Sequence, residues 1–379
     1  MEDMRPLSGL KIVEFAGIGP APFAGQLLAD LGADVVVVDR PQRGEIGLAQ
    51  SVDRRGKRSI VLDLKAPAGK AVAVQLAVWA DVLIEGNRPG VMERLGLGPE
   101  PLMAQNPALI YARMTGWGQG GPRAVQAGHD INYLSLTGAL HAMGDADRPP
   151  PPPLNLVGDF GGGSMFLIMG ILSALYAARA TGKGQVVDAA IVDGVNAMMG
   201  MFHGLHAAGG WQPARQSNWL DGGVPYYRCY RCADGRFMAV GAIEAKFFAQ
   251  MLAGLGLDPE AFGPQHEVAL HVEQMALLET VFARKTMEEW GVVFADTDAC
   301  VTPVLTYEEV ASDPHMAARH ALTTVNGLCH PAVAPRMGVE ACTDTPADIP
   351  KDGGDSNDIL NMLGLAADSL LATGAVRQA

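Results

Sequence analysis

Two residues that can move protons lie on either side of a proline run in the middle of the chain. His129 follows Gly128 in the segment GHDINY, and Asp159 follows Gly158 in VGDFGGGS. Each comes directly before an apolar pattern typical of a helix, so the sequence predicts an imidazole and a carboxyl at two helix N-termini. Five prolines, residues 149–153, separate the two segments. Because glycines beside both groups leave room for a ligand, the arrangement favours proton transfer on a bound small molecule.

The position of each group suggests how it would act. The positive end of a helix dipole favours the neutral imidazole of His129, which is the form that accepts a proton. The carboxylate of Asp159 could accept hydrogen bonds from free N–H groups of residues 161–163, which could instead stabilise an oxyanion. The structural alternative is that Asp159 only caps a helix and that His129 begins a helix capped by Asp130. The spacing alone leaves both interpretations open.

Composition bounds the class of protein and of ligand. A chain of 379 residues that is 49% hydrophobic and 18% charged is globular and long enough for about two domains. The net charge of −13 argues against a nucleic-acid binder, and it means that an anionic ligand needs a local basic patch. One candidate patch is the segment DRRGKRS, whose basic residues are Arg54, Arg55, Lys57 and Arg58. The alternative is that this segment is only a solvated loop.

Targeting and membrane signals are weak. The start, MEDMRPLSGL, is not a secretory signal, and the end, AVRQA, is not a peroxisomal address. The apolar stretch at residues 160–178 approaches the length of a membrane span, but its three glycines and the adjacent Asp159 favour a buried core helix. We therefore expect a cytoplasmic protein without membrane contact. The five cysteines are scattered, and Cys229 and Cys232 are expected to be free thiols rather than part of a metal site.

The first half of the chain alternates strand and helix patterns. A buried strand pattern at residues 10–15, a helix at 20–31 and a second strand at 34–38 form a βαβ opening, which predicts a parallel sheet with helices on its faces. Further strands are predicted at residues 60–64, 82–85, 109–114 and 185–189, and a helix at 69–79.

The first strand-to-helix turn resembles a dinucleotide site only in part. Gly17 and Gly19 have the GxG spacing, and Asp39 ends the second strand. The third glycine of the fingerprint would fall at Pro22, which cannot donate a backbone hydrogen bond to a pyrophosphate. Arg40 follows Asp39 directly and suits a phosphate better than a ribose hydroxyl. These residues predict a Rossmann-like fold whose nucleotide-type ligand is not NAD.

The composition changes along the chain predict a second, smaller domain. We place a large Rossmann-like domain at residues 1–190, completed by 325–379, then a linker helix and loop at 191–224, and a small α+β domain at 225–324. The small domain opens with a hairpin, after which Glu244 begins a helix. Two further helices are predicted in it from the capping-box patterns Thr286-x-x-Glu289 and Thr306-x-x-Glu309.

Several segments, in order along the chain, resemble the family III CoA transferases, and within them the α-methylacyl-CoA racemase branch. The resemblance covers about residues 7–319 and fades in the tail. The segments are LSGLKIVEFAGIGPAPFAGQLLADLGADVVVVDRP, IEGNRPGVMERLGLG, GHDINY, PPLNLVGDFGGGS and GKGQVVDAA. The resemblance implies a fold of the α/β class, with a Rossmann-like parallel-sheet large domain and a smaller α+β domain in an interlocked ring-shaped homodimer. The site then lies between the large domain of one subunit and the small domain of the other.

The same resemblance assigns roles to individual residues. It implies that His129 and Asp159 are the catalytic pair and that Glu244 is linked to the histidine. It further implies that Tyr133 borders the thioester or pantetheine. The basic residues to which it carries the CoA phosphate role are Arg40 and Arg88, followed by Arg55 and Arg94.

Three functions are open at this point. The first is a racemase of lipid metabolism that interconverts (R)- and (S)-2-methylacyl-CoA thioesters by 1,1-proton transfer. Its substrates would include the CoA thioesters of branched-chain fatty acids. It needs no metal or cofactor, because CoA is part of the substrate. The second is a CoA transferase in which Asp159 forms a mixed anhydride. The third is a non-catalytic nucleotide- or acyl-CoA-binding protein. A histidine at position 129 favours the racemase, since the typical transferase lacks one there.

Overall fold

The computed structural model describes residues 5–42, 51–337 and 347–379, and these form two compact units. The first unit comprises residues 1–137, 153–199 and 314–379, and the second comprises 138–152 and 200–313. The domain boundaries expected from the sequence, at residues 190, 225 and 324, differ from the limits of these two units. The helix after residue 190 packs within the first unit, and the segment around the proline run belongs to the second.

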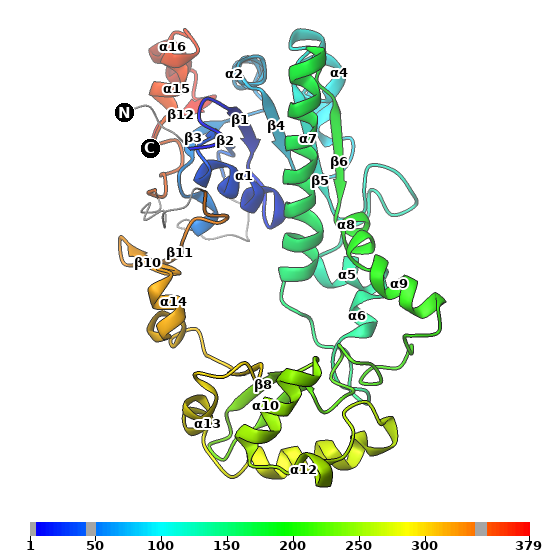
Figure 1. Ribbon diagram of the computed structural model, residues 1–379. Coiled ribbons are helices and arrows are strands. Elements are labelled where there is room, and N and C mark those ends of the chain that lie inside the picture. Colours follow the sequence, from blue (N-terminus) through cyan, green and yellow to red (C-terminus); the bar gives the residue numbers. More distant parts are fainter. Residues whose placement is uncertain (1–4, 43–50, 338–346) are drawn as a thin grey trace. The chain divides into compact units, whose positions relative to one another are not determined.

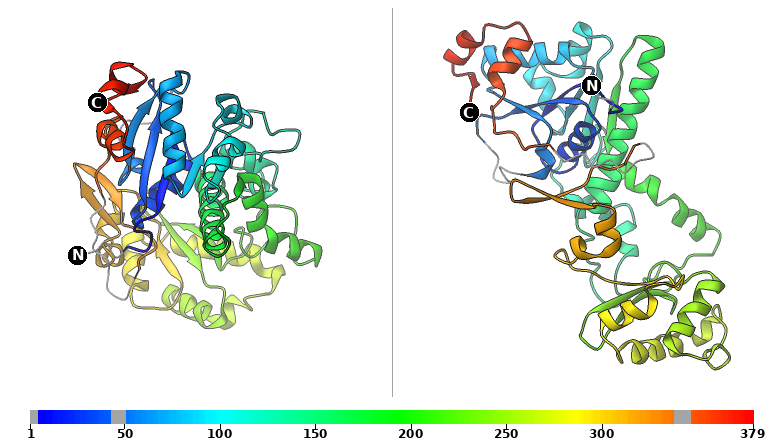
Figure 2. Two further views of the ribbon diagram at one scale, coloured as in Figure 1. Left: turned by 90° about the horizontal axis from the view of Figure 1, so that it is seen from above. Right: turned by 60° about the vertical axis from the view of Figure 1, so that its left-hand side comes forward.

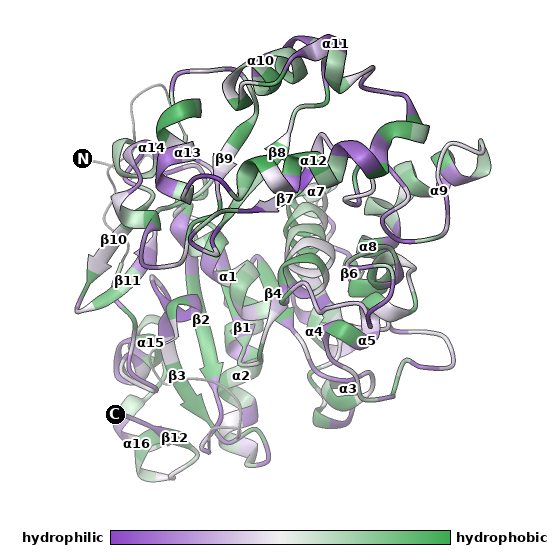
Figure 3. Ribbon diagram, turned by 90° about the horizontal axis from the view of Figure 1, so that it is seen from below, coloured by the Kyte–Doolittle hydropathy of each residue, from purple (hydrophilic) through white to green (hydrophobic). Residues whose placement is uncertain are grey.

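A seven-stranded sheet with the order β12-β3-β2-β1-β4-β5-β6 forms the centre of the first unit. All pairs are parallel except β12 with β3. The strands are β1 Lys11–Phe15, β2 Asp34–Asp39, β3 Arg58–Leu62, β4 Val82–Glu85, β5 Ile110–Thr115, β6 Val186–Ala190 and β12 Val376–Arg377. The mostly hydrophobic residues of β2 and β3 are visible in Figure 3. The predicted parallel sheet is confirmed, with strand ends displaced by up to two residues.

Helices cover both faces of this sheet, and α7 runs beside β5 and β6 (Figure 1). One core cluster joins the sheet to α2, α4, α15 and α16, while α1 and α7 pack elsewhere on it. The helices are α1 Pro20–Asp30, α2 Pro67–Trp79, α3 Val91–Leu95, α4 Pro99–Gln105, α5 Asp130–Ser135, α7 Phe166–Thr181, α8 Ile191–Met198, α14 Pro314–Ala318, α15 Ser356–Met362 and α16 Ala367–Ala372. A separate hairpin, β10 Leu322–Val325 and β11 Leu328–Pro331, completes the elements of this unit apart from the short turns and η2, described below.

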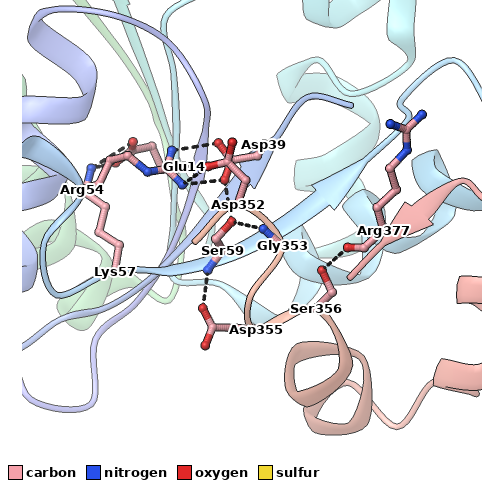
Figure 4. Close-up of polar contacts among 10 residues, drawn as sticks. All are labelled: Glu14, Asp39, Arg54, Lys57, Ser59, Asp352, Gly353, Asp355, Ser356 and Arg377. Atoms are coloured by element: carbon pink, nitrogen blue, oxygen red, sulfur yellow. Dashed lines mark hydrogen bonds and ion pairs between the residues drawn. The ribbon is translucent and has the colours of Figure 1, made fainter. Parts of the chain in front are cut away.

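The C-terminal segment is part of the sheet. Both views in Figure 2 show it beside the first strands, where β12 pairs with β3. Ser59 anchors it: the Ser59 hydroxyl donates to Asp39 (2.6 Å) and accepts from the Gly353 N–H (2.7 Å), and the Ser59 N–H donates to Asp355 (2.8 Å) (Figure 4). The Ser356 hydroxyl donates to the carbonyl of Arg377 (2.6 Å).

The second unit contains a three-stranded antiparallel sheet, β7-β8-β9, covered by helices. A core of aromatic and aliphatic side chains, including Tyr230, Phe282 and Trp290, joins them. Its strands are β7 Tyr227–Arg231, β8 Phe237–Gly241 and β9 Val301–Pro303; its helices are α6 Ala139–Ala142, α9 Gly200–Ala207, α10 Ala245–Leu255, α11 Pro259–Phe262, α12 His271–Phe282 and α13 Met287–Phe294. The predicted hairpin is confirmed.

Among the residues that the structure describes, one helical stretch, Leu156–Thr181, is long and apolar enough to cross a membrane. The expected buried core helix is only half right, because α7 buries a single face through Leu167, Ile171 and Ala174. The opposite face leaves Met169 56% and Tyr176 80% exposed within the single chain.

Candidate active site

His129 lies where the sequence predicts, at the N-terminus of α5. It is the residue before Asp130–Ser135, its side chain is exposed, and its N–H donates to Asn132 Oδ1 at 3.0 Å. This exchange closes the first turn, because the N–H of Asn132 donates back to the carbonyl of His129 at 2.8 Å. The imidazole is therefore held at a defined helix start and remains accessible to a ligand.

Tyr133 braces the loop that leads to His129. Its hydroxyl donates to the carbonyl of Gly128, and its ring packs edge-on against Trp117, with 4.8 Å between ring centroids. An ideal Cβ at Gly116 would lie 2.0 Å from the Tyr133 ring, so only glycine fits there. The predicted contact of Tyr133 with a thioester or pantetheine stays a prediction, and the structure adds this positioning role to it.

Asp159 does not lie at an α-helix N-terminus, contrary to the prediction. It lies within a π-helix, η2 Leu156–Met165, and α7 begins only at Phe166. In a π-helix each N–H binds the carbonyl five residues earlier, so the N–H groups of residues 161–163 are engaged rather than free. They therefore cannot serve as the predicted donors to Asp159 or to an oxyanion. π-Helical turns often occur at functional sites, where they place a side chain that a regular helix would not.

Close packing against α1 and α8 explains the glycines of this segment. The backbones approach so closely that an ideal Cβ at Gly194 of α8 would lie 1.9 Å from the carbonyl oxygen of Gly162. On the other side, the Ser164 hydroxyl donates to the carbonyl of Pro20 at 2.7 Å. The rings of Phe23 and Phe160 pack with their centroids 4.3 Å apart. The GGG sequence therefore serves packing.

Replacing Gly194 with alanine is expected to destabilise the protein, because the added methyl meets backbone atoms that cannot move aside. We expect a loss of about 1–3 kcal/mol or more in the free energy of unfolding, measured by chemical denaturation. Gly204→Ala is the matched control, since no atom lies within 4 Å of its ideal Cβ and it is exposed in α9. Equal stability of both variants would contradict this explanation.

The carboxyl group of Asp159 is half-buried and has unusual neighbours. Its pKa is raised to about 6, first by burial and then by the negative charge of Asp130, while a hydrogen bond from Asn155 and the charge of His129 oppose the shift. Gly19 makes room for this group, because an ideal Cβ there would lie 3.0 Å from Asp159 Oδ2. His129 and Asp159 are thus within electrostatic reach, and at neutral pH the carboxyl can both take and give a proton.

Three of the four arginines proposed for CoA are exposed. Arg40 follows β2 and donates to Asn87 Oδ1 at 3.2 Å, which places it beside the loop after β4. Arg88 lies in that loop; burial raises the pKa of Tyr133, and the charge of Arg88 opposes this rise. Arg94 is exposed on α3. Arg40 and Arg88 therefore flank the side of the first unit that carries Tyr133.

Arg55 cannot bind CoA in this structure, which corrects the prediction. It is 1% exposed, its Nε and Nη2 donate to both carboxylate oxygens of Asp30 at 3.0 and 2.7 Å, and its Nη1 donates to the Pro331 carbonyl at 2.7 Å. A guanidinium with these partners would have to break a buried pair to reach a phosphate.

The other basic residues of the predicted patch are also paired internally, and Figure 4 shows this for Lys57 and Arg54. Lys57 binds Glu14 at 2.7 Å, and burial raises the pKa of Glu14 to about 7. Arg54 binds Asp39 at 2.7 Å, and Arg58 binds Asp34 at 2.7 Å. The segment is neither a ligand patch nor a solvated loop. It cross-links the sheet, and the pairing of Asp39 removes the acceptor that a dinucleotide ribose would require.

Glu244 belongs to the second unit, where it precedes α10 and is exposed. Burial raises the pKa of the Cys300 thiol, and the charge of Glu244 raises it further, so the two lie near each other. Cys300 lines a hollow of about 710 Å³ whose wall also includes Cys229, Tyr227 and Arg228. The four cysteines within the described ranges are free thiols, as the sequence predicts for Cys229 and Cys232. Those ranges contain no cluster of three metal-ligating His, Cys, Asp or Glu side chains.

Comparison with known proteins identifies relatives over nearly the whole chain. The family model CoA-transferase family III matches residues 7–355. The chain is 44% identical to the α-methylacyl-CoA racemase of Mus musculus, over 96% of this chain and 95% of the relative. It is 47% identical to the α-methylacyl-CoA racemase of Homo sapiens, over 84% and 82%. A crystal structure of a CAIB/BAIF family protein from Brucella suis is similar, with a TM-score of 0.81, 28% identity, and coverage of 94% of this chain and 99% of that one. The chain therefore belongs to CoA-transferase family III.

Proposed function

We propose that this protein is a racemase that interconverts the (R) and (S) forms of 2-methylacyl-CoA thioesters. The observation that carries the proposal is the pairing of His129 with a carboxyl group, Asp159, whose pKa is raised to about 6. A carboxyl group with this pKa can both give and take a proton at neutral pH, and a neighbouring imidazole can do the same, as a reversible epimerisation requires. The relatives that are 44–47% identical carry the name of this activity, which supports the same conclusion.

The proposed reaction is a 1,1-proton transfer through an enolate. The thioester makes the substrate α-proton more acidic than that of a free acid. His129 removes this proton from one face, and protonated Asp159 delivers a proton to the opposite face; for the other enantiomer the roles are exchanged. Positioned acid and base groups each contribute about 10²–10⁴-fold to such a rate. The thioester itself activates the α-carbon, so the mechanism uses no metal, flavin or nicotinamide.

The CoA portion of the substrate is proposed to bind along the first unit. Arg40 and Arg88 are exposed cations on one side of the sheet, and Arg88 acts electrostatically on Tyr133. In a chain with a net charge of −13, such cations are needed to attract the phosphates of CoA. Arg94 is a further candidate, and Arg55 is not.

The racemase and transferase hypotheses differ in what they need from Asp159. A transferase would form a covalent mixed anhydride at Asp159 and require a second carboxylic acid. We therefore test racemisation with one enantiomer of a 2-methylacyl-CoA and no acceptor acid, and analyse the configuration of the acid after hydrolysis. Equilibration of the two enantiomers supports the racemase. Unchanged configuration, with an acyl group that hydroxylamine traps from Asp159, would replace it with the transferase.

We further propose that the protein is a homodimer and that Glu244 of one subunit reaches the His129 side of the other. The exposed face of α7 supports a second copy as its partner: Met169, Leu172 and Tyr176 follow the i, i+3, i+7 spacing of one helical face, and Met165 at the end of η2 continues it. An uncovered apolar stripe of this kind is typical of an interface.

The wild-type protein is therefore expected to sediment as a dimer in analytical ultracentrifugation. Met169→Asp should shift it toward monomer, because the substitution buries a charge in the interface. Val292→Asp, at an exposed apolar position of α13, should remain dimeric. A monomeric wild type would exclude the dimer while leaving the assignment of His129 and Asp159 untouched.

A further inference from the structure

The side chain of Asp130 connects the two halves of the candidate proton-transfer site. Asp130 follows His129 directly and opens α5, yet its carboxylate does not cap that helix. Its Oδ1 instead accepts the N–H of Asp159 at 2.7 Å, across 29 residues of sequence. The N–H of Gly158 also donates to this carboxylate. The α5 start that carries His129 is thus bound to the backbone that carries Asp159.

The fit of this contact is close. An ideal Cβ at Gly158 would lie 2.1 Å from Asp130 Oδ1, so the glycine before Asp159 is required for the carboxylate to reach the backbone. Charge-assisted hydrogen bonds of this type are short and about twice as strong as neutral ones. The second oxygen, Oδ2, is buried without a hydrogen-bond partner among the described residues. Burying a carboxylate with one unbonded oxygen costs folding free energy. This cost indicates that Asp130 does more than accept backbone hydrogen bonds, and that its charge acts on its neighbours.

The charged surroundings of Asp159 make Asp130 the neighbour that opposes its ionisation. From α5 and the residue before it, Asp130, His129 and Tyr133 face the site, and Arg88 acts on Tyr133 from the loop after β4. α1 and α8 meet η2 through uncharged residues: Pro20, Phe23, Ile191 and Val195. Asn155, within the preceding turn, is also uncharged.

We propose that Asp130 is a positioning residue for the reaction: its carboxylate fixes the separation between His129 and Asp159, and its charge keeps the Asp159 carboxyl proton available at working pH. The inference rests on the proposed racemase function, because it concerns the acid–base pair of that reaction. It assigns to Asp130 no contact with the substrate.

The test compares Asp130→Asn and Asp130→Ala with wild type, measuring kcat, KM and the pH profile for both enantiomers. Asparagine keeps an oxygen that can accept the Asp159 N–H but removes the charge, whereas alanine removes both. We expect Asp130→Ala to lower kcat about 10–10²-fold with KM little changed, since small misplacements of reacting groups have effects of this size. Asp130→Asn should recover most of kcat.

The pH profile separates positioning from folding. For either enantiomer, the active enzyme holds one proton on the pair His129 and Asp159, and only its position differs. Both enantiomers should therefore give the same bell-shaped pH profile of kcat/KM. In Asp130→Asn, loss of the negative charge should move the limb that reports Asp159 to lower pH, in both directions alike. Asp358→Asn, an exposed first-turn aspartate of α15, should leave kcat and the profile unchanged.

Each result decides between clear alternatives. Wild-type behaviour of both Asp130 variants, or equal losses in both with no movement of the pH profile, would overturn the inference. If Asp130→Ala does not fold, Asp130→Asn alone decides through its pH profile. If the wild-type protein shows no racemisation at all, the proposed function fails, and that outcome is visible before any Asp130 variant is compared.

Discussion

The His129→Ala variant is expected to lose racemisation in both directions by about 10²–10⁴-fold, yet to retain α-hydrogen exchange for one enantiomer only. In the two-group mechanism, His129 serves one face of the α-carbon and Asp159 serves the other. Without the imidazole, Asp159 can still remove the proton on its own face and return a solvent deuteron there. Exchange with retention of configuration therefore survives for one enantiomer.

The pH dependence of the remaining exchange has a definite sign. Asp159 acts as a base only when ionised, so exchange by His129→Ala should rise with pH through the pKa of Asp159, which is about 6 in the intact protein. Removing His129 also removes a charge that lowers this pKa, so the rise should occur at higher pH in the variant. Mass spectrometry of each enantiomer after incubation in D₂O measures the effect. Equal loss of exchange for both enantiomers would contradict a face-specific pair.

Asp159→Asn is expected to give the mirror-image result, with exchange retained only for the enantiomer whose proton His129 removes. The amide keeps the size of the carboxyl, so it still fits beside Gly19, where an ideal Cβ lies 3.0 Å from the Asp159 oxygen. It cannot accept or deliver the proton, and we expect a loss of racemisation of about 10²–10⁴-fold.

The two variants together distinguish the candidate reactions. If Asp159 formed an acyl anhydride, Asp159→Asn would abolish transfer for both enantiomers equally, and His129→Ala would have no enantiomer-specific effect. A binding protein without catalysis would show no exchange in any form. Reciprocal retention in the pair of variants is a result that only the two-group mechanism predicts.

The sheet could be predicted from the sequence because its strands are buried on both faces and read as apolar runs such as DVVVVD. The placement of Asp159 could not, because the glycine-rich segment LVGDFGGGSM has no apolar periodicity that would distinguish a π-helix from an α-helix. What distinguishes them is tertiary: the backbone of Gly162 lies against Gly194, 32 residues later in the chain.

Charged residues were predicted least well, because their partners are distant in sequence. Arg55 was predicted to bind a CoA phosphate, but its guanidinium donates to Asp30 and to the carbonyl of Pro331, and neither partner is close to it in sequence. The capping box at Thr286 begins α13 as predicted, but the one at Thr306 leads only to a short 3₁₀ turn, Val310–Ser312. There the Glu309 carboxylate also pairs with Arg236, so a tertiary ion pair accompanies the local pattern. Gly19, predicted as part of a failed nucleotide fingerprint, instead borders Asp159.

Proton NMR of a single-enantiomer 2-methylacyl-CoA, incubated with the wild-type protein in D₂O without an acceptor acid, tests the central claim most directly. If His129 and Asp159 transfer the proton, the α-proton signal disappears, the 2-methyl doublet collapses, and both enantiomers accumulate with deuterium at the α-carbon. A substrate that keeps its α-proton and its configuration under these conditions would contradict proton transfer by His129 and Asp159.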